Sequence, residues 1–430
     1  MAIRPDPDRP ATTVAPSLRS RPRILVLRHR AAAPRAYGGP VYTDSLLRLM
    51  QQGPLTADVQ QIVFEPQSGR LVNRVRGVLA ILRSLVTSLP AKAERFRSNG
   101  FRRRLLRRLG NCRYDLVLIN GLDMLWCLPL LADRAPVVYV RHNLEPELYA
   151  QQNGRWKRWR APSLLFRRDA AKLAALEQDA LRACAGIIVV AAGVANGIAE
   201  QAPRTPVLSL PPTFDAPRRR NPATVDRRPT EGPIRLGFVG NLGWWPNRVS
   251  VDWFLSEVWP RVADGCLLHL FGSGSEHLPA GRGLIRHGYV ADLAEVWQTA
   301  EIMIQPIVVG GGINIKVAEA VYHRRPMIAT PLALRSCGLA PDPAILIADG
   351  VEAWVKLLNG SAPRDLRGRQ VSERNAERFA QGDQAQRLAA FLGPLMAAGA
   401  SGPSGLDTPL KPHASGRDQL GSGCLLRQAR

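Results

Sequence analysis

The sequence has no apolar run long enough to cross a membrane. In its 430 residues the longest apolar stretches, such as Gly186–Val194, fall well short of the ~20 residues that a transmembrane helix needs. The first ten residues include three prolines and have no apolar core, so they do not resemble a secretory signal peptide. We therefore expect a soluble, cytoplasmic protein.

Cysteine is scarce, and nothing in the sequence has the spacing of a metal site. The seven histidines are dispersed, and no Gly-x-x-x-x-Gly-Lys-Ser/Thr, His-Glu-x-x-His or Gly-x-Ser-x-Gly motif occurs. A disulfide scaffold and a zinc ribbon are both disfavoured, and we expect neither a metal nor a cofactor. The six cysteines form no Cys-x-x-Cys pair: Cys112, Cys127, Cys184, Cys266, Cys337 and Cys424.

Acidic residues are outnumbered, since 58 Lys and Arg stand against 35 Asp and Glu, which gives a net charge of +23. Only six of the basic residues are lysine. An arginine bias of this kind resembles a genome-wide codon preference more than an adaptation to nucleic acid, so we expect no nucleic-acid partner. The charge favours association with an anionic surface without identifying it.

Short apolar runs alternate with helical periodicity and predict two α/β domains. The helices expected between the runs include 41–50, 163–184, 315–323 and 366–392. Two runs of the first half are near-continuous rather than alternating, which is typical of a parallel sheet covered on both faces. The strands are expected at 23–28, 58–64, 114–120, 136–141, 186–190, 206–210, 234–240, 266–272, 284–289, 301–306, 325–330 and 344–348.

Composition sets the expected boundaries. Both ends of the chain are rich in Pro, Gly, Ser or Thr without periodicity, and a stretch of Pro and Arg lies in the middle. The expected fold class is α/β, with two doubly wound Rossmann-like domains facing each other across a cleft. The predicted order is a disordered leader (1–22), a first domain (23–214), a linker (215–232), a second domain (233–398) and a disordered tail (399–430).

The segment from 305 to 330 has the clearest chemical pattern. A strand leads into Gly310, Gly311 and Gly312, and a helix begins near Asn314. Glycines let the backbone approach an anion closely, and the N–H groups at a helix start carry about half a positive charge. This geometry suits a diphosphate, although a glycine turn of purely structural function has the same pattern.

Two charged residues follow on one face of that helix. Lys316 lies in the first turn and can add a full charge near the diphosphate. Glu319 comes three residues later and can accept hydrogen bonds from ribose hydroxyls. An ion pair on the helix surface is the alternative reading.

The start of the second domain has a similar turn, in which Gly240 and Gly243 follow a strand. Five ordered motifs then resemble the C-terminal half of glycosyltransferase family 4. They are Phe-Val-Gly-Asn-Leu…Trp-Pro-Asn (238–247), Leu-Phe-Gly-Ser-Gly (270–274), His-Gly-Tyr-Val (287–290), Pro…Gly-Gly-Gly…Lys-Val-x-Glu-Ala (306–320) and Pro-Met-Ile-Ala-Thr (326–330).

The first half resembles the same family more weakly. Gly38 and Gly39 match the glycine loop after the first strand, whose amides in the family face the donor diphosphate or the acceptor. His142 looks like the family's histidine beside the donor sugar, and Asn143 and Glu145 cluster with it in the sequence. A histidine after a strand is also often a turn or core residue.

The resemblance implies a GT-B fold and a retaining, metal-independent transferase. Its substrates would be a nucleotide-sugar donor and a glycan or lipid-linked acceptor in the assembly of envelope or exopolysaccharide. The implied catalytic residues are His142, Lys316 and Glu319. The implied donor-binding residues are Gly38, Gly39, Gly240, Asn241, Gly272, Gly310, Gly311, Gly312, Ile313 and Asn314.

The match departs from the family at one position that bears on activity. Many members carry two glutamates separated by seven residues, of which the first touches sugar hydroxyls and the second the ribose. Glu319 matches the second, whereas Gly311 stands at the first. A catalytically inactive GT-B scaffold therefore stays open, as does a nucleotide-sugar epimerase of related fold.

Two basic stretches, 97–109 and 155–168, lie in the first domain. Basic amphipathic helices with aromatic residues suit an anionic membrane surface, and this indicates a peripheral location at the inner face of the plasma membrane. Nucleic-acid binding and an ordinary solvated helix face are the alternatives.

Overall fold

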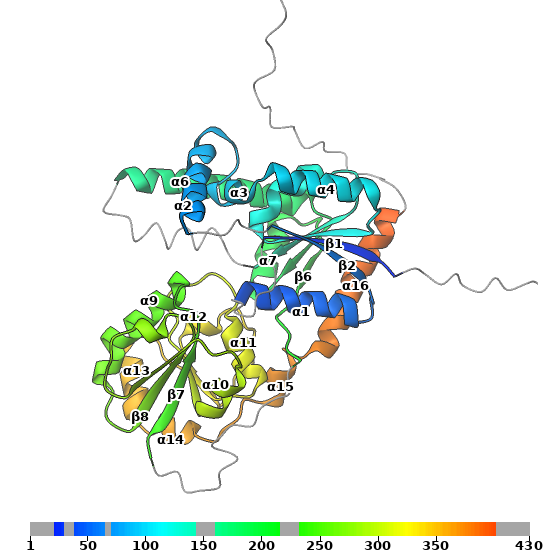
Figure 1. Cartoon of the computed structure of the whole chain (residues 1–430). Coiled ribbons are helices and arrows are strands. Elements are labelled where there is room, and N and C mark those ends of the chain that lie inside the picture. The colour runs from blue at the N-terminus through cyan, green and yellow to red at the C-terminus, as the bar shows by residue number, and fades with distance from the viewer. Residues whose placement is uncertain (1–20, 30–37, 65–69, 143–159, 216–231, 401–430) are drawn as a thin grey trace, which may run out of the picture.

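The computed structural model describes residues 21–29, 38–64, 70–142, 160–215 and 232–400, which form two α/β units (Figure 1). Nearly all of the predicted leader (1–22), tail (399–430) and linker (215–232) lies outside the described residues. The same is true of Asn143, Glu145 and the first five residues of the basic stretch 155–168.

The first sheet has six parallel strands in the order β2-β1-β3-β4-β5-β6. Each of the six expected strands is present, with bounds that differ by no more than two residues. The strands are β1 (Arg23–Arg28), β2 (Asp58–Val63), β3 (Leu116–Asn120), β4 (Val137–Arg141), β5 (Gly186–Val189) and β6 (Val207–Ser209).

The second sheet also has six parallel strands, in the order β12-β11-β10-β7-β8-β9. All six expected strands are again present. They are β7 (Ile234–Val239), β8 (Cys266–Phe271), β9 (Leu284–Gly288), β10 (Ile302–Gln305), β11 (Met327–Ala329) and β12 (Ile345–Ile347). The expected pair of doubly wound α/β domains is confirmed.

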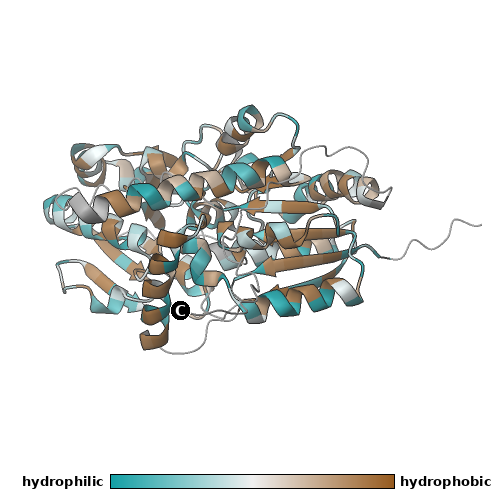
Figure 2. Cartoon of the chain, turned by 90° about the horizontal axis from the view of Figure 1, so that it is seen from above, coloured by the Kyte–Doolittle hydropathy of each residue, from teal (hydrophilic) through white to brown (hydrophobic). Residues whose placement is uncertain are grey.

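The continuous apolar runs are explained by burial on both faces of each sheet. In β1, Leu25 and Leu27 belong to one core cluster, and Ile24 and Val26 belong to another. Successive side chains of a strand point to opposite faces, so the two clusters lie on the two sides of the sheet. The strands visible in Figure 2 are accordingly coloured largely as apolar.

Helices cover the first sheet and connect its strands. The long helix expected at 163–184 is α6, and the one expected at 41–50 extends to both sides as α1. The helical elements are α1 (Gly38–Gln52), α2 (Arg70–Val86), α3 (Ala91–Phe96), α4 (Asn99–Asn111), η1 (Leu122–Leu130), α6 (Arg160–Ala183) and α7 (Ala192–Gln201).

The second sheet is connected in the same way. The expected single helix at 366–392 is wrong, because the chain turns twice there and forms separate helices. The helical elements are α9 (Trp245–Trp253), η2 (Phe254–Val258), η3 (Trp259–Arg261), η4 (Ser275–His277), α10 (Ala294–Thr299), α11 (Ile315–Tyr322), α12 (Pro331–Leu334), α13 (Gly350–Asn359), α14 (Ala362–Leu366), α15 (Glu373–Glu377) and α16 (Gln381–Ala400).

Helix α16 returns from the second domain and packs on the first sheet. Leu388 and Leu392 are fully buried in the same core cluster as Ile24 and Val26 of β1. Gly186 lies so close to α16 that a Cβ there would be 2.7 Å from Leu395 Cδ1. The last helix of the sequence's second half is therefore a structural part of the first domain.

The two domains meet where α1 and α11 begin. Val41 of α1 packs against the core of the second domain, and Ile313 and Ile315 pack against a core cluster of the first. Phe214 continues the contact, since its ring lies 5.5 Å from that of Tyr322 in α11. The two glycine-preceded helix starts predicted from the sequence are thus brought to one interface.

Candidate donor and acceptor site

The start of α11 follows a loop that leaves the carboxyl end of β10, and this loop contains the glycines 310–312. Asn314 stands at the N-cap with an extended backbone, but its side chain does not cap the helix. Its Nδ2 instead donates to the carbonyl of Ala333, at 3.2 Å. The first turn of α11 therefore keeps the character of an anion-binding helix start.

Lys316 is held beside this helix start by two contacts within the second domain. Its Nζ donates to Asn247 Oδ1 at 2.6 Å and lies 4.5 Å from the centroid of the Phe238 ring. Burial lowers the pKa of Lys316 to about 7. The ammonium is therefore poorly solvated without a ligand, and an anion placed next to it would stabilise the protonated form.

Glu319 lies on the same helix and, like Lys316, is only partly accessible to solvent. Burial raises the pKa of its carboxyl group to about 7. A lysine and a glutamate that both titrate near neutrality, one turn apart at a domain interface, form an unusual pair. Perturbed pKa values of this kind gather at functional sites, because such sites place charges where water is scarce.

The turn after β7 is connected to Lys316 by hydrogen bonds through Asn247. Asn241 Oδ1 accepts a hydrogen bond from the Gly243 amide at 2.6 Å, and the Asn241 carbonyl accepts one from Asn247 Nδ2 at 2.9 Å. Asn247 thus connects the turn to Lys316. Asn247 is the last residue of the Trp-Pro-Asn motif, but it was not among the site residues predicted from the sequence.

Gly240 and Gly272 have a packing role. Gly272 has a φ of +119°, and a Cβ there would lie 2.2 Å from the Gly240 carbonyl oxygen. The ends of β7 and β8 can approach so closely only because Gly272 lacks a side chain, while a Cβ on Gly240 would lie 3.1 Å from Asn247 Nδ2. These two predicted donor-binding residues shape the turn, and their contact with a donor stays a prediction.

His142 directly follows β4 in the first domain, and its side chain is held by a chain of hydrogen bonds. Its Nε2 lies 2.8 Å from Asn120 Oδ1, and Asn120 Nδ2 donates to Thr43 Oγ1 at 2.9 Å. With the amide in this orientation, Nε2 carries the proton and Nδ1 is left as an acceptor. Burial lowers the pKa of His142 to about 4, so the imidazole is neutral at physiological pH.

His142 is also connected to the domain interface. Its ring makes an edge-to-face contact with Tyr42 at 5.3 Å between centroids, and Tyr42 lies in the first turns of α1. Gly38 and Gly39 begin the same helix. The structure therefore gathers the predicted first-domain residues around the start of α1, next to the start of α11.

A charged cluster that sequence reasoning missed lies near His142. Asp123 Oδ2 is 3.3 Å from His29 Nδ1, and Asp123 Oδ1 is 3.6 Å from Lys92 Nζ. All three charges act on the pKa of His142. The only signal in the sequence was the position of Asp123, three residues after the end of an apolar strand.

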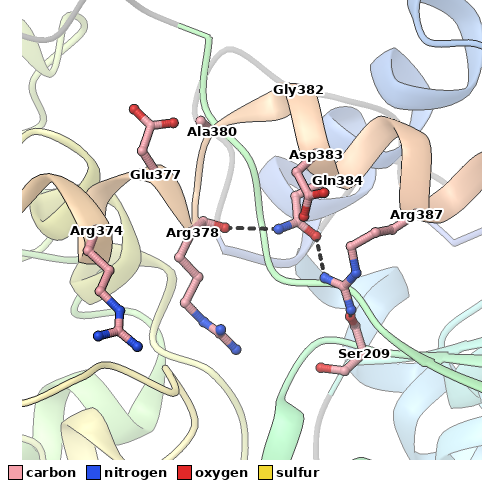
Figure 3. Close-up of a pocket in the computed structure, with 9 residues that line it drawn as sticks. All are labelled: Ser209, Arg374, Glu377, Arg378, Ala380, Gly382, Asp383, Gln384 and Arg387. Carbon is pink, nitrogen blue, oxygen red and sulfur yellow. Dashed lines mark hydrogen bonds between the residues drawn. The ribbon is translucent and has the colours of Figure 1, made fainter.

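Two cavities among the described residues contain no predicted site residue. One of about 520 Å³ lies where α15 leads into α16, with Arg374, Arg378 and Arg387 on its walls (Figure 3). The other, of about 450 Å³, lies between α2 and α4. Within the described ranges, no group of three or more His, Cys, Asp or Glu side chains could hold a metal ion.

Two doubly wound domains that meet at two helix starts define the GT-B class of glycosyltransferases. Residues 38–216 match the family model described as Glycosyltransferase Family 4, and residues 233–359 match the model described as Glycosyl transferases group 1. The two matches cover both domains. The chain belongs to this glycosyltransferase family.

Solved structures share the fold of this chain. Sucrose-phosphate synthase from Thermosynechococcus elongatus is 14% identical and has a TM-score of 0.61, and the alignment covers 87% of this chain and 100% of that one. HepE from Anabaena, solved with UDP and glucose, is 13% identical with a TM-score of 0.53, over 86% of this chain and 99% of that one. No curated protein sequence matches significantly. These likenesses establish the fold alone.

Proposed function

We propose that the protein is a retaining, metal-independent glycosyltransferase. It transfers a sugar from a nucleotide-sugar donor to a glycan or lipid-linked acceptor during the assembly of envelope or exopolysaccharide. One observation carries the proposal: Lys316 and the start of α11 lie at the interface with the start of α1. A ligand placed there is met by a helix start from each domain.

The proposed reaction breaks the bond between the anomeric carbon and the diphosphate and forms a bond from that carbon to an acceptor oxygen. The acceptor's proton passes to the departing diphosphate on the same face of the sugar. Charge therefore builds up on the diphosphate, and Lys316 with the amides of 310–312 would stabilise it. Preorganised groups of this kind commonly contribute on the order of 100-fold or more in rate.

Glu319 and His142 would orient the donor. In this proposal the Glu319 carboxylate accepts hydrogen bonds from the ribose hydroxyls, one helical turn from the diphosphate. Neutral His142 accepts a hydrogen bond from a sugar hydroxyl through Nδ1, because Nε2–H is engaged by Asn120. A positively charged imidazole would instead repel the oxocarbenium-like centre.

The acceptor would approach from the first domain. Asp123, with His29 and Lys92 around it, acts on the pKa of His142 and would hold an acceptor hydroxyl. A lipid-linked acceptor implies a protein that works at the inner face of the plasma membrane. The basic stretches 97–109 and 155–168 are the proposed contacts with that anionic surface. No helix of the described residues is long and apolar enough to span a membrane.

A thermal-shift screen of the purified chain against UDP, GDP, ADP and their common sugars tests the donor site. UDP and UDP-glucose come first, because HepE has been solved with UDP-glucose. A ligand at about 100 times its Kd should stabilise the protein by about 2.7 kcal/mol. We expect a selective shift that Lys316→Ala and Glu319→Ala remove.

Two results would redirect the assignment. No shift with any nucleotide would favour the inactive GT-B scaffold, in keeping with Gly311 at the position of the family's first glutamate. A shift accompanied by interconversion of the free nucleotide-sugar, without an acceptor, would favour the epimerase. Lys356→Met is a suitable control, since this lysine is exposed on α13 far along the chain from the site.

A further inference from the structure

Helix α2 turns its apolar face toward solvent. Eight large apolar side chains on it are between 41% and 85% exposed. Contiguous exposed apolar surface of this kind marks a contact with a partner or a membrane, because it gains nothing from water. The eight residues, called here the α2 stripe, are Leu71, Val72, Val75, Val78, Leu79, Ile81, Leu82 and Val86.

The spacing of the stripe shows that it is one continuous face. Positions 71, 75, 78 and 82 follow the four-three-four spacing of a helical row, and the remaining four flank it. Ala80 and Ser84 lie on the opposite side and are buried. The helix therefore packs on the domain with small or polar residues and presents its large apolar residues outward.

This orientation is fixed by hydrogen bonds to α6. Lys172 Nζ donates to the carbonyls of Ser84 and Thr87, and Arg168 Nη2 donates to the Leu85 carbonyl at 2.9 Å. Leu164 and Leu165, about one turn before Arg168, are also exposed. The start of α6 thus adds exposed apolar side chains about one turn from the contact with the end of α2.

Basic residues border the stripe. Arg74 and Arg83 are exposed on α2, and α4 carries five exposed arginines. Between 70 and 113 the sequence has thirteen basic residues and one acidic residue. Figure 1 shows α2, α4 and α6 on the side of the first domain away from the second domain.

The cavity of about 450 Å³ between α2 and α4 lies beside the stripe. Arg76 of α2 and Arg103, Arg104 and Arg107 of α4 line it, and its lining contains no acidic residue. Phe64 and Phe101 form its apolar walls. An amphiphile with a phosphate headgroup matches both the cavity and the stripe.

We propose that the α2 stripe inserts into the interfacial layer of an anionic phospholipid bilayer, with lipid headgroups bound at the arginines of the adjoining cavity. A second copy of this chain fits less well, since pairing two stripes would bring two strongly basic surfaces together. Arginine stems can lie along the apolar layer while their guanidinium groups reach the phosphates. The bilayer thus meets both the apolar and the charged part of the surface.

Membrane contact through α2 would bring the proposed lipid-linked acceptor close to the acceptor-side cluster around Asp123. Helix α3 packs against α2 and against η1, and its Lys92 pairs with Asp123. A membrane-bound α2 therefore places the bilayer one helix away from the acceptor-side cluster. The membrane inference rests on the proposed function only for this point, because binding to lipid needs no catalysis.

Vesicle flotation of the full chain tests the inference. Vesicles of phosphatidylcholine are compared with vesicles that also contain phosphatidylglycerol, at low and high salt. We expect binding to the anionic vesicles alone, weakened by salt. The triple variant Leu71→Ser, Val78→Ser, Leu82→Ser should lower partitioning by about 100-fold or more, because three inserted side chains are lost.

Two further variants separate the contributions. Arg103→Gln with Arg107→Gln should reduce binding to the level seen on phosphatidylcholine, and inorganic phosphate should not compete at moderate concentration. Ile347→Ser removes a comparably exposed residue of the second domain and should leave binding unchanged.

Several outcomes would overturn the inference. These are no binding of the wild type to anionic vesicles, equal binding by the triple variant, or a wild-type dimer that the triple variant dissociates. The nucleotide thermal shift is measured on the same preparations. A stripe variant that keeps the nucleotide shift but loses vesicle binding shows that the donor site and the membrane surface are separate.

Discussion

At the scale of single residues, Lys316 and Glu319 make donor binding depend on pH in opposite directions. The pKa of Lys316 is lowered to about 7, so its charge is present below neutrality and lost above it. The pKa of Glu319 is raised to about 7, so its charge is present above neutrality and lost below it. The state with both charges is most populated near neutral pH.

We expect the affinity for a nucleotide-sugar to pass through a maximum near neutral pH. Beyond about pH 6 and pH 8 it should fall by up to about tenfold per pH unit, since one proton is involved on each side. Titration calorimetry measures it, and a nucleotide-sugar is preferred to UDP because its diphosphate does not titrate there. At the higher ligand concentrations that weaker binding requires, Lys316→Met should lack the alkaline limb, and Glu319→Gln the acid limb. A flat profile would contradict this assignment.

Sequence reasoning found the residues that belong to motifs and missed those that do not. Lys316 and Glu319 stand in an ordered pattern of glycine and charge, and His142 follows a legible strand. Asn120 and Asp123 are single polar residues near the end of β3. Their role beside His142 depends on β4 lying next to β3, which is a long-range contact that no local pattern encodes.

At the scale of elements, α16 follows the second domain in the sequence but packs in the core of the first. We expect Leu392→Ala to cost about 2–5 kcal/mol, because a fully buried leucine leaves a cavity under the first sheet. Hydrogen exchange should then rise in β1 and β3. The control, Leu358→Ala in the core of the second domain, should raise exchange in β7 and β10 instead. Faster exchange in β7 after Leu392→Ala would contradict the packing.

The strands were predictable as apolar runs because parallel strands are buried on both faces, and periodicity needs no tertiary information there. The helices near the end of the chain were not predictable in this way. Val371 and Phe379 lie between the helices α14, α15 and α16, yet both are fully buried. Apolar spacing therefore continues through two breaks and imitates one long helix. The α2 stripe was equally unreadable, since periodicity shows that a face is apolar but not which way it points.

At the scale of the whole molecule, two chain crossings connect the domains. Phe214 and Ala380 form a parallel bridge, and the Phe214 amide donates to the Phe379 carbonyl at 3.0 Å. The segment leaving the first domain thus lies beside the one returning to it. Relative motion of the two domains would bend both crossings together, while the α1 and α11 starts lie at the interface that such motion opens or closes.

A nucleotide-sugar that contacts both helix starts must bind the closed arrangement more tightly than any open one, because only closure presents both sets of groups. We expect the radius of gyration in small-angle X-ray scattering to decrease when the nucleotide-sugar identified by the thermal shift is added. Lys316→Ala should not compact at the same ligand concentration, whereas Lys356→Met should. A ligand that gives a full thermal shift without compaction would place the donor on the second domain alone. The contribution of the first domain would then be limited to the acceptor.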